Sequence, residues 1–242
     1  MDAIKTTSLT KQYGSLTALN GLDLTVRDGE LFALLGVNGA GKTTAIKLLS
    51  CLMKPTAGTA TIYGHDIVTQ SHEARALLST SPQETAVAPN LTTRENLELM
   101  AGIYGANGKE AKVKATEMIA RFNLSSIEKT KAKKLSGGWQ RRLSIAMALI
   151  SEPEILFLDE PTLGLDVLAR SDLWDLIRSL KGRVTIILTT HYMEEAEALS
   201  DRIAIMKDGR LLICATAEEI KQKAETDHFE EAFIRIVKED VQ

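Results

Sequence analysis

Apolar and polar positions along the first part of the chain predict short strands separated by turns. Every second residue from Leu22 to Val26 is apolar, so we expect one face of this strand to be solvated. Leu31–Leu35 is apolar without interruption, as in a parallel strand that is covered on both faces. A helical pattern then runs from Lys42 to about Leu52 and stops before Pro55. The segment therefore predicts a strand, a glycine-containing loop and a helix in succession.

The pattern changes between residues 84 and 150, where apolar residues recur at helical spacing. Thr92 and Glu95 have the spacing of a capping box, and apolar residues follow them from Leu97 to Tyr104 at helical positions. This spacing of apolar residues predicts a helical insertion that interrupts the alternation of strands and helices.

Alternation of strands and helices resumes after the insertion, with apolar runs at 155–158 and 184–188. We therefore predict an α/β fold whose core is a P-loop NTPase-type, mostly parallel sheet with an antiparallel β portion at the N-terminus. Residues 1–242 would form one domain, in which 1–83 and 151–242 make the core and 84–150 a helical subdomain.

Composition and charge fit a folded globular protein and exclude several other classes. The chain has 242 residues, of which 44% are hydrophobic and 25% charged, and its net charge is -3. This balance gives no global attraction to nucleic acid, so no nucleic-acid partner is expected. The N-terminus lacks the apolar segment of a signal peptide, and no run approaches the roughly 18 apolar residues of a membrane helix. We expect a cytoplasmic protein whose two cysteines, Cys51 and Cys214, are packing residues.

The strongest chemical motif is the loop Gly36–Thr43, which fits the P-loop pattern. Its glycines let successive backbone N–H groups surround a phosphate, and the following helix directs its positive end at the same site. An accidental glycine turn is the alternative interpretation. The predicted nucleotide ligands in this loop are Asn38, Gly39, Ala40, Gly41, Lys42, Thr43 and Thr44. Lys42 would neutralise β- and γ-phosphate charge, and the Thr43 hydroxyl would bind Mg²⁺.

A second acidic element follows the apolar strand Ile155–Leu158, which ends in Asp159 and Glu160. A strand of a parallel sheet delivers such carboxylates to the edge where ligands bind. Asp159 would hold Mg²⁺ or its water, and Glu160 would polarise the water that attacks the γ-phosphate. The alternative is an acidic helix cap after a buried strand.

A third element, the segment Leu135–Arg142, contains Ser136, Gly137 and Gly138 at the start of a helical pattern. A serine and two glycines that open a helix make a second anion site. If the P-loop holds one side of ATP, this helix could hold the γ-phosphate of a nucleotide that is carried by another copy, which would make ATP the link of a dimer.

These motifs occur in the order found in ATP-binding subunits of ABC transporters, which the chain resembles over nearly its whole length. The resemblance implies that Tyr13 stacks on adenine, that Gln83 contacts Mg²⁺ and the attacking water, and that His191 contacts the γ-phosphate. It also implies that Leu163–Asp166 crosses the dimer seam and brings Asp166 to the nucleotide. Outside this context the residues would be a surface tyrosine, a loop glutamine and a structural histidine.

Two positions depart from the common family pattern. Val37 replaces a frequent proline in the P-loop, and Trp139 occupies the fifth position of the Leu135–Trp139 signature, where glutamine is frequent. The segments 91–97 and 227–235 resemble the exporter branch that includes drug-resistance ATPases and bacterial relatives of lipid flippases.

The resemblance implies an ATPase subunit that dimerises around two ATP·Mg²⁺ and drives transport, in the direction of export, through separate integral membrane permease subunits. The partner would be a second ATPase subunit, as a homodimer, and the permease would hold the chain at the inner face of the cell membrane. An ABC-type ATPase that regulates a soluble complex is the alternative. A GTPase is disfavoured because the chain lacks an Asn-Lys-x-Asp pattern for guanine.

Overall fold

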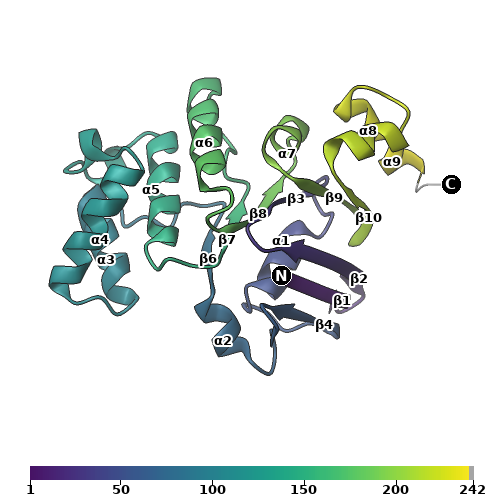
Figure 1. Cartoon of the computed structure of the whole chain (residues 1–242), viewed down its shortest axis with the longest axis horizontal. Coiled ribbons are helices and arrows are strands. Elements are labelled where there is room, and N and C mark those ends of the chain that lie inside the picture. Colours follow the sequence, from purple (N-terminus) through teal and green to yellow (C-terminus); the bar gives the residue numbers. More distant parts are fainter. Residues whose placement is uncertain (240–242) are drawn as a thin grey trace.

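Two β-sheets organise the computed structural model, which describes residues 1–239 (Figure 1). The smaller sheet is antiparallel and has the strand order β2-β1-β4-β5. Its strands are β1 (Asp2–Tyr13), β2 (Leu16–Arg27), β4 (Ala57–Ile62) and β5 (His65–Asp66). The predicted solvated face of β2 is confirmed, because Leu22, Leu24 and Val26 are buried while Asp23 between them is exposed.

The larger sheet has the strand order β10-β9-β3-β8-β7-β6, and every neighbouring pair is parallel except the edge pair β9 and β10. Its strands are β3 (Leu31–Leu35), β6 (Leu78–Ser81), β7 (Ile155–Asp159), β8 (Thr185–Thr190), β9 (Arg202–Lys207) and β10 (Arg210–Ala215). All residues of β3, β7 and β8 are buried, as expected for central strands of a parallel sheet that is covered on both faces. The predicted α/β class and mostly parallel core are confirmed.

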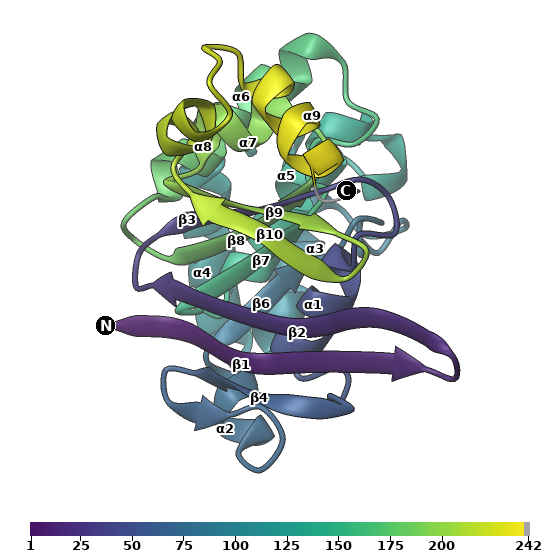
Figure 2. The same cartoon turned by 90° about the vertical axis from the view of Figure 1, so that its right-hand side faces the viewer.

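Helices cover both sides of this sheet. The core helices are α1 (Lys42–Leu49), α2 (Ser71–Ala76), α6 (Val167–Leu180), α7 (Met193–Leu199), α8 (Ala217–Lys223) and α9 (Phe229–Glu239). Helix α1 packs against β2 and β4 of the smaller sheet and against β7 of the larger one, so it lies between the two sheets (Figure 2).

Helix α1 is shorter than its sequence pattern predicts, since it ends at Leu49 and not near Leu52. Cys51 has φ +56°, which turns the chain out of the helical path, and the amides of Leu52 and Met53 close back on the carbonyl of Lys47. Apolar periodicity continued past the point where the backbone leaves the helix.

The predicted helical insertion is present at one end of the molecule (Figure 1). It consists of α3 (Thr93–Ile103), α4 (Gly108–Arg121), two 3₁₀ turns, η1 (Ser125–Ile127) and η2 (Ala132–Lys134), and α5 (Gly137–Leu149). The predicted capping box of Thr92 and Glu95 is formed at the start of α3. Its apolar residues are not all internal: Leu97 is fully buried, but Ile103 is 65% exposed and Tyr104 51% exposed. The last turn of α3 extends beyond its buried face.

Candidate functional site

The glycine loop between β3 and α1 can exist only with glycine at particular positions. Gly41 has φ +99°, and a Cβ atom there would lie 2.6 Å from the carbonyl oxygen of Ala18. Gly39 has φ +85° but open space around it. Helix α1 starts directly after Gly41, has no side-chain cap at its N-terminus and has no acidic residue in its first turn. Its first amides and its positive end are therefore free to bind an anion.

Lys42 begins α1 and is held in place by this loop. Its side chain is buried, and its Nζ donates hydrogen bonds to the carbonyl oxygens of Gly36 (2.6 Å) and Val37 (3.3 Å). Burial lowers the pKa of Lys42, while the nearby charges of Glu160 and Asp159 oppose that shift. The ammonium group is thus positioned at the loop before any phosphate arrives.

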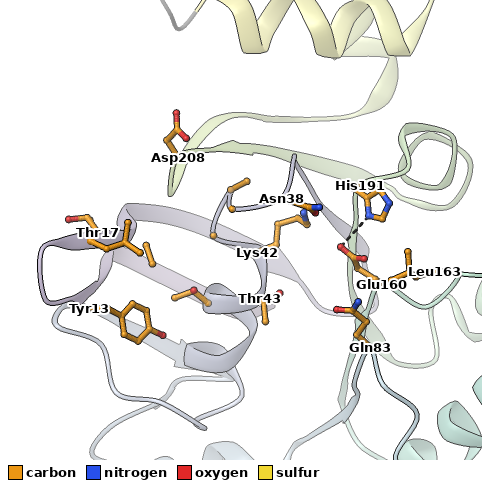
Figure 3. Close-up of a pocket in the computed structure, with 16 residues that line it drawn as sticks. Tyr13, Thr17, Asn38, Lys42, Thr43, Gln83, Glu160, Leu163, His191 and Asp208 are labelled. Carbon is orange, nitrogen blue, oxygen red and sulfur yellow. Dashed lines mark ion pairs between the residues drawn. The ribbon is translucent and has the colours of Figure 1, made fainter.

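Glu160 faces Lys42 across a cleft of about 790 Å³ (Figure 3). Its backbone is in the left-handed region, with φ +46°, and its amide donates to the carbonyl oxygen of Thr189 (3.0 Å) and to the hydroxyl of the same residue (3.1 Å). Such a conformation in a residue other than glycine persists only where its surroundings hold it, and it is common at functional sites. The Glu160 Oε1 atom lies 3.2 Å from Nδ1 of His191.

The cleft brings together most of the residues that the sequence nominated. Its lining includes Tyr13, Asn38, Gly39, Ala40, Gly41, Lys42, Thr43, Thr44, Gln83, Glu160 and His191. Figure 3 shows the loop residues on one wall, with Glu160, His191 and Gln83 on the facing wall and Tyr13 at the far end. Helix α1, β6, β7 and β8 all deliver these side chains at or just beyond their cleft-facing ends.

Asp159 lies behind this lining and not in it. It is only 8% exposed, and its Oδ1 accepts a hydrogen bond from the Thr189 hydroxyl. The carboxylate still lies close enough to Lys42 to influence its pKa. A group bound in the cleft would reach Asp159 most readily through an intervening water.

Ser136, Gly137, Gly138 and Asp166 do not line the cleft. Ser136 stands at the N-terminus of α5 without a capping hydrogen bond from its side chain, so the first amides of that helix are available to an anion. Asp166 caps α6, and its Oδ1 accepts a hydrogen bond from the Ala169 amide (2.9 Å). Ser136, Gly138 and Asp166 share a separate hollow of about 300 Å³. Within one chain the two predicted anion sites are therefore distinct.

Trp139, the unusual residue of the signature segment, lies on the edge of this second hollow. The Arg142 guanidinium lies over its indole ring, 5.1 Å from the ring centroid. The ring also packs against the hydrophobic cluster that joins the helical insertion to the larger sheet. Ser136 is the N-cap of α5, and Gly137 and Gly138 are its first two residues.

Sequence analysis missed five further residues of the cleft: Leu16, Thr17, Ala18, Leu163 and Asp208. Leu16, Thr17 and Ala18 are the first three residues of β2, close in sequence to Tyr13. Leu163 lies in the segment that was assigned to a dimer seam. Asp208 forms the turn between β9 and β10, and a Cβ atom on the next residue, Gly209, would lie 2.9 Å from the Ala18 carbonyl oxygen. Only tertiary packing brings this turn to the cleft.

Among residues 1–239, no group of three or more His, Cys, Asp and Glu side chains is arranged to hold a metal ion. In the same described range, no helix combines the length and the apolar character that crossing a membrane requires.

Residues 19–163 match the family model described as ABC transporter. The chain is 42% identical over 229 residues to the daunorubicin resistance ATP-binding protein DrrA3 of Streptomyces coeruleorubidus, with 94% of this chain and 72% of that protein covered. It is 39% identical to the probable multidrug ABC transporter ATP-binding protein YbhF of Escherichia coli, with coverages of 97% and 41%.

Solved structures show the same fold. The ATP-binding subunit of an ABC transporter superposes with a TM-score of 0.84 at 28% identity, covering 97% of this chain and 99% of the other. A dimeric post-hydrolysis state of the ATP-binding cassette MJ0796 with ADP and Pi superposes with a TM-score of 0.77 at 29% identity, with coverages of 88% and 98%.

Proposed function

The chain belongs to the ABC transporter family and is an ATPase, and from this premise we propose that it is the ATP-hydrolysing subunit of a drug-resistance type exporter. Two copies would bind two ATP·Mg²⁺ between them and drive separate membrane subunits. The names of its relatives support the exporter branch, since DrrA3 is a daunorubicin resistance protein and YbhF a probable multidrug transporter protein.

One observation carries this proposal: the residues nominated to bind the nucleotide lie in two separate places, the cleft and the hollow at the start of α5. Lys42 and Glu160 face one another across the cleft, while Ser136 opens α5 outside it. The hollow at Ser136 is separate from the cleft of the same chain, and we explain it as the place where the nucleotide of another copy is bound. The solved MJ0796 dimer with ADP and Pi supports such an assembly.

The roles of the cleft residues follow from their donor chemistry. The amides of Asn38–Gly41 and the side chains of Lys42 and Thr44 would hold the phosphates, because they present N–H, ammonium and hydroxyl groups to an anion. Tyr13, 44% exposed, offers its ring to adenine. His191 would donate to the γ-phosphate from its position beside Glu160.

The oxygen atoms near the β- and γ-phosphate end fit Mg²⁺. Thr43 contributes a hydroxyl and Gln83 an amide oxygen in the cleft, and Asp159 contributes a carboxylate from behind it. Magnesium prefers such oxygen ligands and retains waters, so Asp159 would bind through a water. When bound, the ion supplies charge neutralisation on the phosphates.

Glu160 would act as the general base. Its carboxylate lies in the cleft opposite the phosphate-binding loop, and its backbone is fixed by two hydrogen bonds to Thr189. The γ-phosphoryl transfer needs a water that is positioned and polarised, which an ionised carboxylate at this place supplies. Ser136, Gly137, Gly138 and Asp166 of the second copy would complete the site and contact the nucleotide only while the γ-phosphate is present.

An exposed apolar groove provides a docking place for the permease. It holds about 340 Å³ and is lined by Leu52, Met100 and Tyr104, of which Leu52 is 71% exposed. Pro82 also lines the groove, and the next residue, Gln83, lines the nucleotide cleft. A shift at the γ-phosphate can therefore reach the groove through one peptide unit, with residues 84–150 moving as a subdomain of the single 1–242 domain. This docking would hold the chain at the cytoplasmic face of the membrane.

Glu160→Gln tests the catalytic assignment. The variant should bind ATP normally but hydrolyse it far more slowly, because the amide cannot accept a proton from water. Glu194→Gln is a matched control, since the Glu194 side chain is 78% exposed and does not line the cleft. Undiminished ATP hydrolysis by Glu160→Gln would refute the assigned base.

Copurification tests the transporter assignment. Tagged chain that is extracted in mild detergent from its own cells should carry an integral membrane protein with it. Recovery of a soluble complex in place of a membrane protein would favour the regulatory ABC-type ATPase and contradict the transporter proposal.

A further inference from the structure

Arg141 is a buried arginine that joins helix α5 to two loops of the nucleotide cleft. It lies in the second turn of α5, four residues after Gly137, and is only 4% exposed. Its Nη1 donates to the carbonyl oxygen of Pro82, and its Nη2 donates to the carbonyl oxygens of Gln83 (2.7 Å) and Glu160 (3.0 Å). One guanidinium thus binds the backbone of both residues that would act on the attacking water.

The charge of Arg141 is satisfied in an unusual way. Its hydrogen bonds go to backbone carbonyl groups, and no ion pair joins it to a carboxylate in the part of the chain that the structure describes. Burial lowers the pKa of Arg141, while Asp159 and Glu195 favour its charged form. A buried charge held by carbonyl groups is costly to maintain. The planar fork of the guanidinium is what allows one side chain to reach two loops at once.

The position of Arg141 along α5 links these loops to the second anion site. Ser136 and Gly137 open the helix, and Arg141 follows Gly137 after about one helical turn. A hydrogen-bonded helical turn is stiff, so a displacement of the Ser136 end would carry the guanidinium with it and would be transmitted to the carbonyl groups of Gln83 and Glu160. The phosphate-binding loop is not among its hydrogen-bond partners.

We propose that Arg141 is a positioning residue for ATP hydrolysis, which holds the Gln83 and Glu160 loops in register with the Ser136 end of α5. The segment that meets the nucleotide of a second copy then also sets the geometry of the chain's own cleft. This inference rests on the proposed function, because it takes Glu160 as the base and Ser136 as the contact to the other nucleotide.

The inference predicts that turnover and ATP binding respond differently to substitution. Without the guanidinium, Gln83 and Glu160 lose a shared anchor, and a misplacement on the order of 1 Å can reduce a rate about 100-fold. The residues that bind phosphate keep their own contacts. Substitution of Arg141 should therefore lower kcat and leave the KM for ATP nearly unchanged, whereas a general loss of folded protein would alter the active fraction only.

Arg141→Lys is the main variant, because it retains the charge but replaces the fork by a single ammonium. We expect kcat to fall about 3- to 10-fold in this variant and about 10- to 100-fold in Arg141→Met, with KM for ATP within about 2-fold of the parent value. Rates are divided by the ATP-binding stoichiometry of each preparation. Arg94→Met is the matched control, since Arg94 also lies in the helical insertion but bonds to Glu128 and Thr116.

Parent-like kcat in folded Arg141→Lys would overturn the inference, and so would a rise in KM that accounts for the whole loss of kcat/KM. If Arg141→Met does not fold, the lysine variant alone decides. Glu160→Gln is assayed in parallel. Full activity of Glu160→Gln would refute the proposed function itself. Loss of activity in Glu160→Gln together with full activity of the Arg141 variants would refute only the role of Arg141.

Discussion

Replacing Lys42 with Met should weaken ATP binding without unfolding the protein. The Lys42 ammonium is buried and already donates to two loop carbonyls, so ATP exchanges part of an existing set of hydrogen bonds for phosphate contacts. Methionine keeps the length and packing of the side chain but removes the charge. The variant therefore loses the contact between the ammonium and the phosphates, together with the two hydrogen bonds to the carbonyl groups of Gly36 and Val37.

The expected magnitude follows from the kind of contact that is lost. A hydrogen bond to a charged group contributes about 1.5 to 3 kcal/mol net, which corresponds to roughly a 10- to 150-fold rise in Kd. Burial lowers the pKa of Lys42, but Glu160 and Asp159 oppose that shift and favour the charged form that the phosphates require.

Titration calorimetry with a slowly hydrolysed ATP analogue and Mg²⁺ measures this change, and circular dichroism checks the fold. Lys47→Met is the matched control, because Lys47 lies on the same helix α1 but is exposed and outside the cleft. An unchanged Kd in folded Lys42→Met, or an equal loss in the control, would refute the phosphate role of Lys42.

Three further substitutions have defined outcomes. Gly41→Ala should abolish ATP binding, because the new Cβ atom would lie 2.6 Å from the Ala18 carbonyl oxygen. Gly39→Ala should cost only about 1 to 3 kcal/mol of backbone strain, because its Cβ atom would meet nothing within 4 Å. Equal ATP affinities of the two variants in calorimetry would contradict this. Thr92→Ala should lower the free energy of unfolding by about 1 kcal/mol in urea titrations and leave ATP affinity unchanged, and a parent-like midpoint would count against the cap. Burial raises the pKa of Glu195 above 4.5, although its hydrogen bonds act in the opposite direction. The folded state therefore keeps a proton that the unfolded state releases, and the free energy of unfolding of the parent falls as the pH rises from about 4.5. Glu195→Gln should therefore gain in melting temperature relative to the parent with rising pH, and a difference that is independent of pH would disprove it.

Local motifs made much of the cleft predictable from the sequence. The loop before Lys42 and the carboxylates after β7 each follow an apolar strand, and parallel strands bring their carboxyl ends to one edge. Once the fold class was predicted correctly, it followed that these two motifs meet in one cleft. The pairing of β1 with β2, which follow one another in the chain, and the capping box of Thr92 were also local.

Other features depend on tertiary contacts that no local pattern encodes. Asp208 reaches the cleft because the turn at Gly209 packs against Ala18. Arg141 and Arg142 are adjacent and look equivalent in the sequence, yet only Arg141 binds the Gln83 and Glu160 loops. Helical periodicity likewise predicted an apolar face up to Tyr104. It could not show that Tyr104 stays half exposed among residues 1–239.

The central claim is that ATP is bound between two copies of this chain. Sedimentation velocity of Glu160→Gln measures it most directly, because the variant retains the cleft and blocks turnover. With ATP and Mg²⁺ the mass should double, and with ADP, or with Ser136→Glu added, it should return to that of one chain. A single-chain mass for Glu160→Gln at saturating ATP and Mg²⁺ would contradict the claim.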